Sequence, residues 1–355
     1  MQLSNGLAEP ETGKPESVQA ILARYRRPDG NVSAWQLITT VLAFVVCWTT
    51  MAVALQTSYW LALVMAVPVG ALIIRAFVLQ HDCAHGSFFK DKRWNTWVGR
   101  ALCLITLTPF AFWRRDHLVH HATSGNLERR GFGDIKMLTV AEYESRGWAG
   151  RLSYRMFRNP LFMFGLAPTF YFVLRLRMTW MVPKEWKRER ASVRWTNLTL
   201  LIVYGGLAYL IGPLQLLSIQ LPAIAIGGAA GVWLFYVQHN FEGTYWAHED
   251  EWDETEASMV GSSFLRLPAI LRWCTASIGY HHIHHLDRRV PNYNLQACHD
   301  GHEYLRKVTE LTLWKALPMV RLKLWDEESH EMVGYSAVGA SRKKATESEG
   351  TTSQG

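Results

Sequence analysis

Two long stretches of this 355-residue chain contain no charge at all: residues 35–74 and 198–241 lack Asp, Glu, Lys and Arg. Uncharged stretches of this length are too apolar for the helices of a soluble core, so an ordinary soluble domain is excluded. Cysteine is also scarce. The chain has no C-x-x-C pair, and its odd, scattered set argues against a disulfide framework: Cys47, Cys83, Cys103, Cys274 and Cys298.

Several catalytic and recognition motifs are missing. There is no H-E-x-x-H, which excludes the zincin type of metalloprotease, and no nucleophile elbow, P-loop or dinucleotide-binding glycine motif follows a strand-like run. The 37 basic and 30 acidic residues give a net charge of +7, but the basic residues flank the apolar stretches and form no nucleic-acid motif. We therefore expect no nucleic-acid partner and assign the basic residues to contacts with anionic lipid headgroups.

The two uncharged stretches each break once, at Gln56-Thr57-Ser58 and at Gly212-Pro213. A helix of roughly 20 residues crosses the hydrocarbon core, so the pattern predicts four spanning helices in two hairpins. Their expected positions are near residues 34–55, 58–79, 196–211 and 216–237. Both hairpin turns are uncharged and Arg75 lies at the opposite end of its helix, so the positive-inside rule places both termini and the region between the hairpins in the cytoplasm.

These features predict an all-α integral membrane protein in three parts. Residues 1–33 form a polar cytoplasmic segment without a signal-peptide core, residues 34–320 form one membrane domain, and residues 321–355 form a cytoplasmic tail. From Ser336 onward the tail is small and polar, which is typical of disorder. Two shorter apolar segments, residues 97–113 and 160–174, are predicted to lie as helices at the membrane interface.

The strongest signal is the distribution of the 14 histidines. Eight of them form three clusters with helical spacing, and a ninth follows the fourth apolar span in the sequence FYVQHNFE. The clusters read HDCAH, HLVHH and HHIHH, and the nine residues are His81, His85, His117, His120, His121, His239, His281, His284 and His285.

This spacing has a direct physical meaning. Residues at positions i, i+3 and i+4 share one face of a helix, so each cluster directs two or three imidazoles toward one point. Nine imidazoles exceed the needs of one ion, and a single zinc site uses three or four ligands. Imidazole binds iron, zinc, copper and nickel alike, but the number of ligands and the need for redox chemistry favour a pair of irons.

Neighbouring residues are assigned by their position. Asp82, Asp116 and Asp287 lie beside or within two residues of a clustered histidine, so we predict that their carboxylates orient imidazoles. The remaining histidines are predicted to be ordinary polar groups rather than ligands: His248, His282, His299, His302 and His330.

The segments HDCAHGSFF, HLVHHATSGN and GYHHIHHLDRRVPNY closely resemble the three histidine boxes of membrane-bound fatty acid desaturases, most of all the bacterial acyl-lipid type. The resemblance covers roughly residues 35 to 320. It implies four transmembrane helices beneath a cytoplasmic helical cap, in which the eight box histidines bind a di-iron centre. It also assigns His239, in FYVQHNFE, as a further ligand.

By the same resemblance, the protein uses dioxygen and two external electrons to introduce a cis double bond into a fatty acyl chain. The expected substrate is an acyl lipid, with the bond at a Δ12-type or Δ9-type position, and the expected location is the bacterial inner membrane. No cytochrome b5-like HPGG segment is present. The electrons are therefore expected from a separate ferredoxin or cytochrome b5-like protein.

Two classes of alternative remain open at this point. Similar histidine boxes serve di-iron membrane hydroxylases, acetylenases, ketolases and alkane monooxygenases, and only the product separates these enzymes from a desaturase. A membrane metal transporter is the alternative outside enzymes, but it would require polar residues along the middle of the spans, which have almost none.

Overall fold

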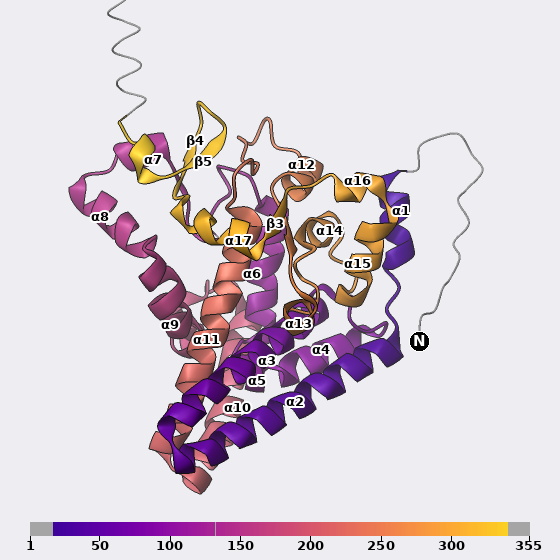
Figure 1. The fold of residues 1–355 in the computed structure, drawn as a ribbon, viewed down its shortest axis with the longest axis vertical. Coiled ribbons are helices and arrows are strands. Elements are labelled where there is room, and N and C mark those ends of the chain that lie inside the picture. Colours follow the sequence, from indigo (N-terminus) through magenta and orange to yellow (C-terminus); the bar gives the residue numbers. More distant parts are fainter. Residues whose placement is uncertain (1–16, 132, 340–355) are drawn as a thin grey trace, which may run out of the picture.

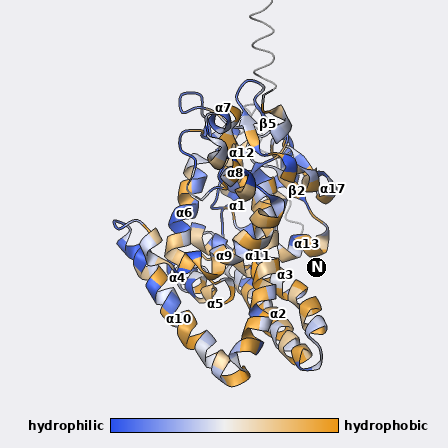
Figure 2. Ribbon diagram, turned by 90° about the vertical axis from the view of Figure 1, so that its left-hand side faces the viewer, coloured by the Kyte–Doolittle hydropathy of each residue, from blue (hydrophilic) through white to orange (hydrophobic). Residues whose placement is uncertain are grey.

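The computed structural model describes residues 17–131 and 133–339, and most of them are helical (Figure 1). Within these ranges, three helices are long and apolar enough to cross a membrane: α2 (Gly30–Thr57), α3 (Tyr59–His85) and α11 (Pro213–His239). These three helices correspond to three of the four predicted spans. Figure 2 shows the end of the molecule that they form as predominantly hydrophobic.

The fourth predicted span lies in α10 (Lys187–Ile211), a helix of 25 residues that does not reach the same apolarity. Its first turns carry Lys187, Arg188 and Arg190, so only its second half is uncharged. Gly212, with φ +91°, then reverses the chain into α11. Both hairpin turns lie at the same end of the molecule (Figure 1), but a fourth crossing stays a prediction.

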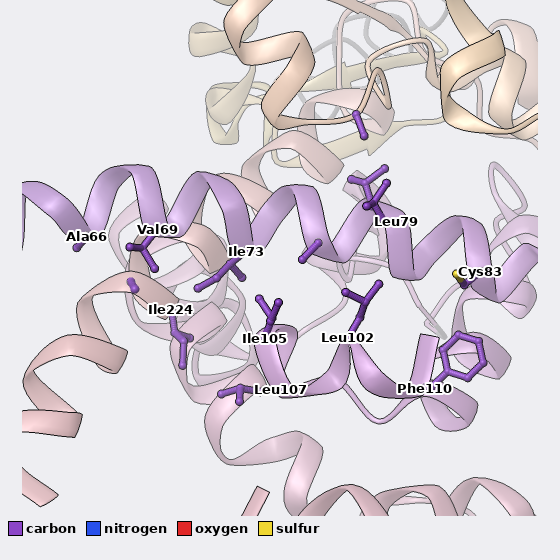
Figure 3. Packing of buried hydrophobic residues seen from close by; sticks show 14 of the residues in the cluster. Ala66, Val69, Ile73, Leu79, Cys83, Leu102, Ile105, Leu107, Phe110 and Ile224 are labelled. Atoms are coloured by element: carbon purple, nitrogen blue, oxygen red, sulfur yellow. The ribbon is translucent and has the colours of Figure 1, made fainter. Parts of the chain in front are cut away.

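Helix α3 is the centre of the apolar core. Ala66, Val69 and Ile73 line one stretch of it, and the cluster continues into α5 (Cys103–Thr106) and α11 (Figure 3). Where α3 crosses α11, two glycines face each other. A Cβ atom on Gly70 would lie 3.0 Å from the backbone nitrogen of Gly227, and a Cβ atom on Gly227 would lie 2.9 Å from the Gly70 carbonyl oxygen. The two backbones therefore touch, which only small residues permit.

This contact gives a first prediction. Gly70→Val is expected to force α3 and α11 apart and to destabilise the protein by about 1–3 kcal/mol, as overpacking does elsewhere. The matched control is Gly231→Val on α11, because no atom lies within 4 Å of a Cβ atom there. Thermal melting in detergent measures both variants, and equal melting temperatures would show that the close crossing is absent.

The other half of the molecule carries the histidines and is built from short elements. Between α3 and α10 lie α4 (Lys92–Ala101), α5, α6 (Phe110–Thr123), β1 (Leu138–Thr139), α7 (Val140–Glu144), α8 (Trp148–Phe157), η1 (Leu161–Leu166), α9 (Ala167–Val173), η2 (Arg175–Arg177) and η3 (Thr179–Met181). After α11 lie α12 (Glu254–Met259), β2 (Phe264–Arg266), α13 (Ala269–Cys274), α14 (His281–Leu286), α15 (Asn292–Gly301), α16 (Glu303–Arg306), β3 (Glu310–Thr312), α17 (Leu313–Ala316), η4 (Leu317–Arg321), β4 (Leu324–Asp326), β5 (Glu331–Val333) and η5 (Tyr335–Ala337). Helix α1 (Val18–Tyr25), near the amino terminus, packs on α15 of this half.

Two small sheets hold this half together, and strand signals in the sequence are too weak to predict either. Strand β1 pairs in parallel with β4, which pairs in antiparallel with β5, and β2 pairs in parallel with β3. Each strand has only two or three residues, too few for an alternating apolar pattern to show.

The structure also bears on the segments expected at the interface and in the tail. Residues 97–113 span the end of α4, α5 and the start of α6, and residues 160–174 form η1 and α9. Both are helical as predicted; their depth in a membrane stays a prediction. Of the predicted tail, residues 321–339 include β4, β5 and η5, while the expectation of disorder from Ser336 falls mostly on 340–355, outside the described residues.

Candidate metal centre

All nine predicted histidines come together, and they lie on four helices. His81 and His85 occupy the last turns of α3, which stops because Gly86 adopts φ +73°. His239 is the last residue of α11. The second box lies in the carboxyl-terminal half of α6, and the third box forms most of the short helix α14.

The nine side chains form two groups, in each of which one nitrogen per residue lies within 4.8 Å of the others. The five-histidine group contains His81, His85, His117, His121 and His284. The four-histidine group contains His120, His239, His281 and His285.

Each H-x-x-H-H box is divided between the two groups. On α6 the pair separated by four residues, His117 and His121, enters the five-histidine group, and His120 enters the other. On α14 the division is reversed, so that His281 and His285 enter the four-histidine group. The i, i+4 pair and the middle residue point to different sides of the same helix face, so one box supplies ligands to two sites.

Within each group, ring nitrogens face one another directly. The Nε2 atom of His121 lies 3.1 Å from that of His117 and 2.9 Å from that of His284. In the other group the Nε2 atom of His281 lies 2.9 Å from that of His239 and 3.1 Å from that of His285. A ring nitrogen carries at most one hydrogen, so these contacts cannot all be hydrogen bonds.

A shared ion accounts for the spacing. Two nitrogens bound to one ion at about 2.1 Å lie about 3.0 Å apart at a right angle and about 3.4 Å apart in a tetrahedron. The separations of 2.9 to 3.1 Å are therefore close to those of imidazole nitrogens that share one ion. Four buried nitrogens of these nine histidines also lack any hydrogen-bond partner among the described residues: His85 Nδ1, His85 Nε2, His120 Nε2 and His281 Nδ1. The donor set fits two metal ions.

Three imidazoles are oriented by a hydrogen bond at Nδ1. His120 donates to the carboxylate of Asp134, His81 donates to Asp82 at 3.2 Å, and His239 donates to the carbonyl oxygen of Gly261 at 3.1 Å. A hydrogen fixed on Nδ1 leaves the lone pair on Nε2, the nitrogen that faces the group.

The buried environment favours the neutral form of the clustered imidazoles, which is the form that binds a cation. Burial, and then the neighbouring histidines, hold the pKa of His117, His121, His281, His284 and His285 well below the usual value. Imidazole binds a metal in its neutral form, so little proton release is needed for these residues.

The three aspartates selected from the sequence behave differently. Asp82 contacts His81 and also accepts hydrogen bonds from the backbone and side chain of Asn292, at 2.8 and 2.9 Å. Asp287 instead accepts hydrogen bonds from Arg26 and Arg289. Across residues 17–131 and 133–339, no hydrogen bond joins Asp116 or Asp287 to a clustered histidine. Burial and the charge of Asp134 raise the pKa of Asp116 to about 6.

Asp134 is the residue that the sequence reasoning missed. It lies 14 residues from His120, in a loop with no histidine of its own. Gly133, with φ +71°, brings this loop against α6, where a Cβ atom would lie 2.8 Å from the Cβ atom of His120. The available signal was a Gly-Asp pair soon after the second box, which is weak without the fold.

The other histidines lie outside both groups. His282 is buried beside the third box, but its Nε2 atom lies 3.0 Å from the Leu305 carbonyl oxygen. His299 contacts His282, His302 contacts Tyr25, and His248 is exposed between Glu128 and Glu327. His330 lies on the turn between β4 and β5.

Three helices able to cross a membrane and nine histidines in two groups that could each hold a metal ion define the class of this protein as a helical, membrane-type polyhistidine protein. Comparison with known proteins specifies the family. A family model described as fatty acid desaturase matches residues 58–312. The chain belongs to the fatty acid desaturase family, as its histidine boxes predicted, and is an oxidoreductase.

Individual relatives agree with this assignment. A fatty acid desaturase of Bacillus subtilis (strain 168) is 38% identical over 325 residues, which is 92% of each chain. An sn-1 acyl-lipid omega-3 desaturase (ferredoxin) of Synechocystis is 27% identical over 262 residues, 70% of each chain. An sn-1 oleoyl-lipid 12-desaturase of Picosynechococcus is 25% identical over 282 residues, 76% of each chain.

The two groups lead to a prediction about metal removal. A bound ion stabilises only the folded state, so the metal-loaded protein is expected to melt several degrees above the same protein after chelation. The His120→Ala, His121→Ala double variant should lose this difference, because one ligand of each group is gone. Identical melting curves for the loaded and chelated wild-type protein would contradict the site.

Proposed function

We propose that this protein is a membrane desaturase that places a cis double bond in the acyl chain of a lipid, with two irons bound by the nine histidines. The single observation that carries the proposal is the division of the three boxes into a five-histidine and a four-histidine group. An iron pair would supply the dioxygen-dependent oxidising power needed to remove two hydrogens from an unactivated chain. Overall, one dioxygen, two electrons and two protons would be consumed for each double bond, and two waters formed.

The protein's own contribution is the orientation of the histidine rings and of the acyl chain. Asp82, Asp134 and the Gly261 carbonyl hold three imidazoles in fixed directions. His81, His85 and His239 lie at the ends of α3 and α11, beside the apolar core, so an acyl chain lying along these helices would reach the two groups from the membrane. Positioning matters because a displacement of about 1 Å costs roughly 100-fold in rate.

We further propose four crossings, with the histidine-bearing half in the cytoplasm. Helix α10 supports a fourth crossing, because Leu201, Ile202 and Leu210 are each at least 66% exposed on its uncharged half. Its basic first turns lie at the end away from the uncharged hairpin turn, as the positive-inside rule requires. The membrane we propose is the bacterial inner membrane, with the histidine-bearing half of the protein on its cytoplasmic side.

The names of two relatives support the choice of substrate and donor. The Synechocystis and sunflower (Helianthus annuus) proteins are described as ferredoxin-dependent acyl-lipid desaturases. We propose an acyl lipid as the substrate and a ferredoxin as the donor here too, with a cytochrome b5-like protein as the other carrier to test. A double bond at a Δ12-type or Δ9-type position remains the expectation from the sequence.

The test is expression in a host with a simple lipid profile, together with a ferredoxin and its reductase. Fatty acid methyl esters would be analysed by gas chromatography and mass spectrometry, with the double bond located by derivatisation. A new unsaturated acyl chain is the expected result. A hydroxylated or keto product would move the assignment to an oxygenase, and iron-loaded protein that forms no new lipid product would count against acyl desaturation.

A further inference from the structure

Three arginines beside the five-histidine group carry positive charge that no carboxylate neutralises. Arg114 lies on α6, one turn before His117; Arg188 lies in the first turn of α10; and Arg288 follows α14. Within the described parts of the chain, none of the three forms an ion pair. Their neighbours contrast with them, because Arg115 pairs with Glu189 at 3.4 Å and Arg289 pairs with Asp287 at 2.9 Å.

The packing brings the three arginines together. The start of α10 lies against α6, where the guanidinium of Arg115 stacks 4.2 Å from the ring of Trp186 and the Ala111 backbone donates to Ser192 at 3.1 Å. Arg114 is half-buried, and its Nε atom is buried without a partner. Helix α14, which Arg288 follows, also lies against α6, where the Nε2 atom of His284 is 2.9 Å from that of His121. Burial, then Arg188 and then Arg288, lower the pKa of Arg114, which agrees with this placement.

Three like charges held together cost free energy unless an anion compensates them. A phosphate group is the matching ligand, because guanidinium forms paired, charge-assisted hydrogen bonds to its oxygens. The first turn of α10 adds to the attraction, since it has no side-chain cap and a helix amino terminus favours an anion.

The position of the cluster indicates what carries the phosphate. Arg114 lies three residues before His117, and Arg288 lies four residues after His284, whose ring centroid is 4.8 Å from that of His85. An anion here would therefore lie beside the five-histidine group, at the basic end of the helix α10, whose second half is apolar. A lipid with a phosphate headgroup has this combination of charge and acyl chain.

We propose that Arg114, Arg188 and Arg288 bind the headgroup phosphate of a glycerophospholipid and so align its acyl chain with the histidine centre. This inference rests on the proposed function, because it names the headgroup of the acyl-lipid substrate. The phosphates of a coenzyme A thioester share the same chemistry, and the experiment separates the two.

The test measures binding, so it needs no turnover. Purified protein in an uncharged detergent would be titrated with fluorescent dioleoyl phosphatidylglycerol, with a monogalactosyl lipid bearing the same chains, and with oleoyl-coenzyme A. We expect tight binding of the phospholipid and, in the Arg114→Gln, Arg188→Gln, Arg288→Gln triple variant, a loss of at least about tenfold, the equivalent of about 1.4 kcal/mol. Binding of the galactolipid should not change.

Two controls keep the result specific. Arg194→Gln removes the same charge from an exposed position on the same helix and should leave phospholipid binding unchanged. Arg188→Gln alone, also exposed, should weaken binding even if Arg114→Gln disturbs folding, and unchanged iron content would report an intact centre. An equal loss in Arg194→Gln, or no loss in the triple variant, would overturn the proposal.

The remaining outcomes separate the two ligand sources and the two proposals. Tighter binding of oleoyl-coenzyme A that depends on the three arginines would overturn the phospholipid assignment. Specific phospholipid binding without any desaturated product would leave the site standing and reject the proposed function. If the protein desaturated phospholipid and galactolipid equally and the triple variant changed neither rate, the proposed function would stand and the arginine site would be rejected.

Discussion

Alanine at either His120 or His121 is expected to abolish desaturation, with product at least about 10³-fold below the wild type, because each removes a ligand from a centre that acts as a unit. The two residues are adjacent but serve different groups. His121 faces His117 and His284 in the five-histidine group, whereas His120 belongs to the four-histidine group. Either variant should therefore lose iron from one group first, and bound iron should fall from two per chain toward one.

The matched control is His282→Ala, which removes an adjacent buried histidine of α14 that belongs to neither group. It should lower the melting temperature, because the Leu305 carbonyl loses its partner, yet keep two irons per folded chain. His248→Ala, at the surface, should change neither property. Elemental analysis and quantification of fatty acid methyl esters measure the two effects. Iron loss in His282→Ala as large as in His120→Ala would refute the division into groups.

Asp134→Asn is expected to reduce iron affinity or activity by about 10–100-fold, the usual effect of removing a carboxylate that orients a histidine ligand. The carboxylate accepts the Nδ1 hydrogen of His120, and an amide is a weaker acceptor that can also present its NH₂ group to the ring. The shape of the side chain is preserved, so the variant should fold and melt near the wild-type temperature.

Asp287→Asn provides the contrast. Asp287 was selected from the sequence for its position after the third box, but its carboxylate holds Arg26 and Arg289. Its loss should cost stability, about 1–3 kcal/mol for a hydrogen-bonded charge, while iron affinity stays within about twofold of the wild type. If Asp287→Asn lost iron and Asp134→Asn did not, the assignment of the orienting carboxylate would be wrong.

Local patterns were sufficient to select the nine histidines. A spacing of three and four residues on a helix fixes which side chains share a face, whatever the rest of the chain does. Uncharged stretches likewise identified three long apolar helices, since length and composition alone make a helix able to cross a membrane. The family followed from the same boxes, because their order and spacing are highly specific.

Contacts between segments that are far apart in the sequence could not be predicted from local spacing. Asp134 reaches His120 only because Gly133 lets a loop approach α6, and Leu138 pairs with Leu324 through strands too short to leave a pattern. Asp82 was selected because it is next to a box, and its carboxylate does contact His81. The same criterion selected Asp287, whose carboxylate instead accepts a hydrogen bond from Arg26.

The sequence by itself thus determined which residues point together along each helix, because helical periodicity is a local property. Only the tertiary structure decided how the three boxes divide into groups of five and four, and which carboxylate orients which ring. It also decided that α10 and α14 both lie against α6, so that Arg188 and Arg288 come near Arg114, and none of the three forms an ion pair within residues 17–131 and 133–339. The reason is physical: these features depend on the packing of α6, α10 and α14 against one another, and no single segment of the chain contains that information.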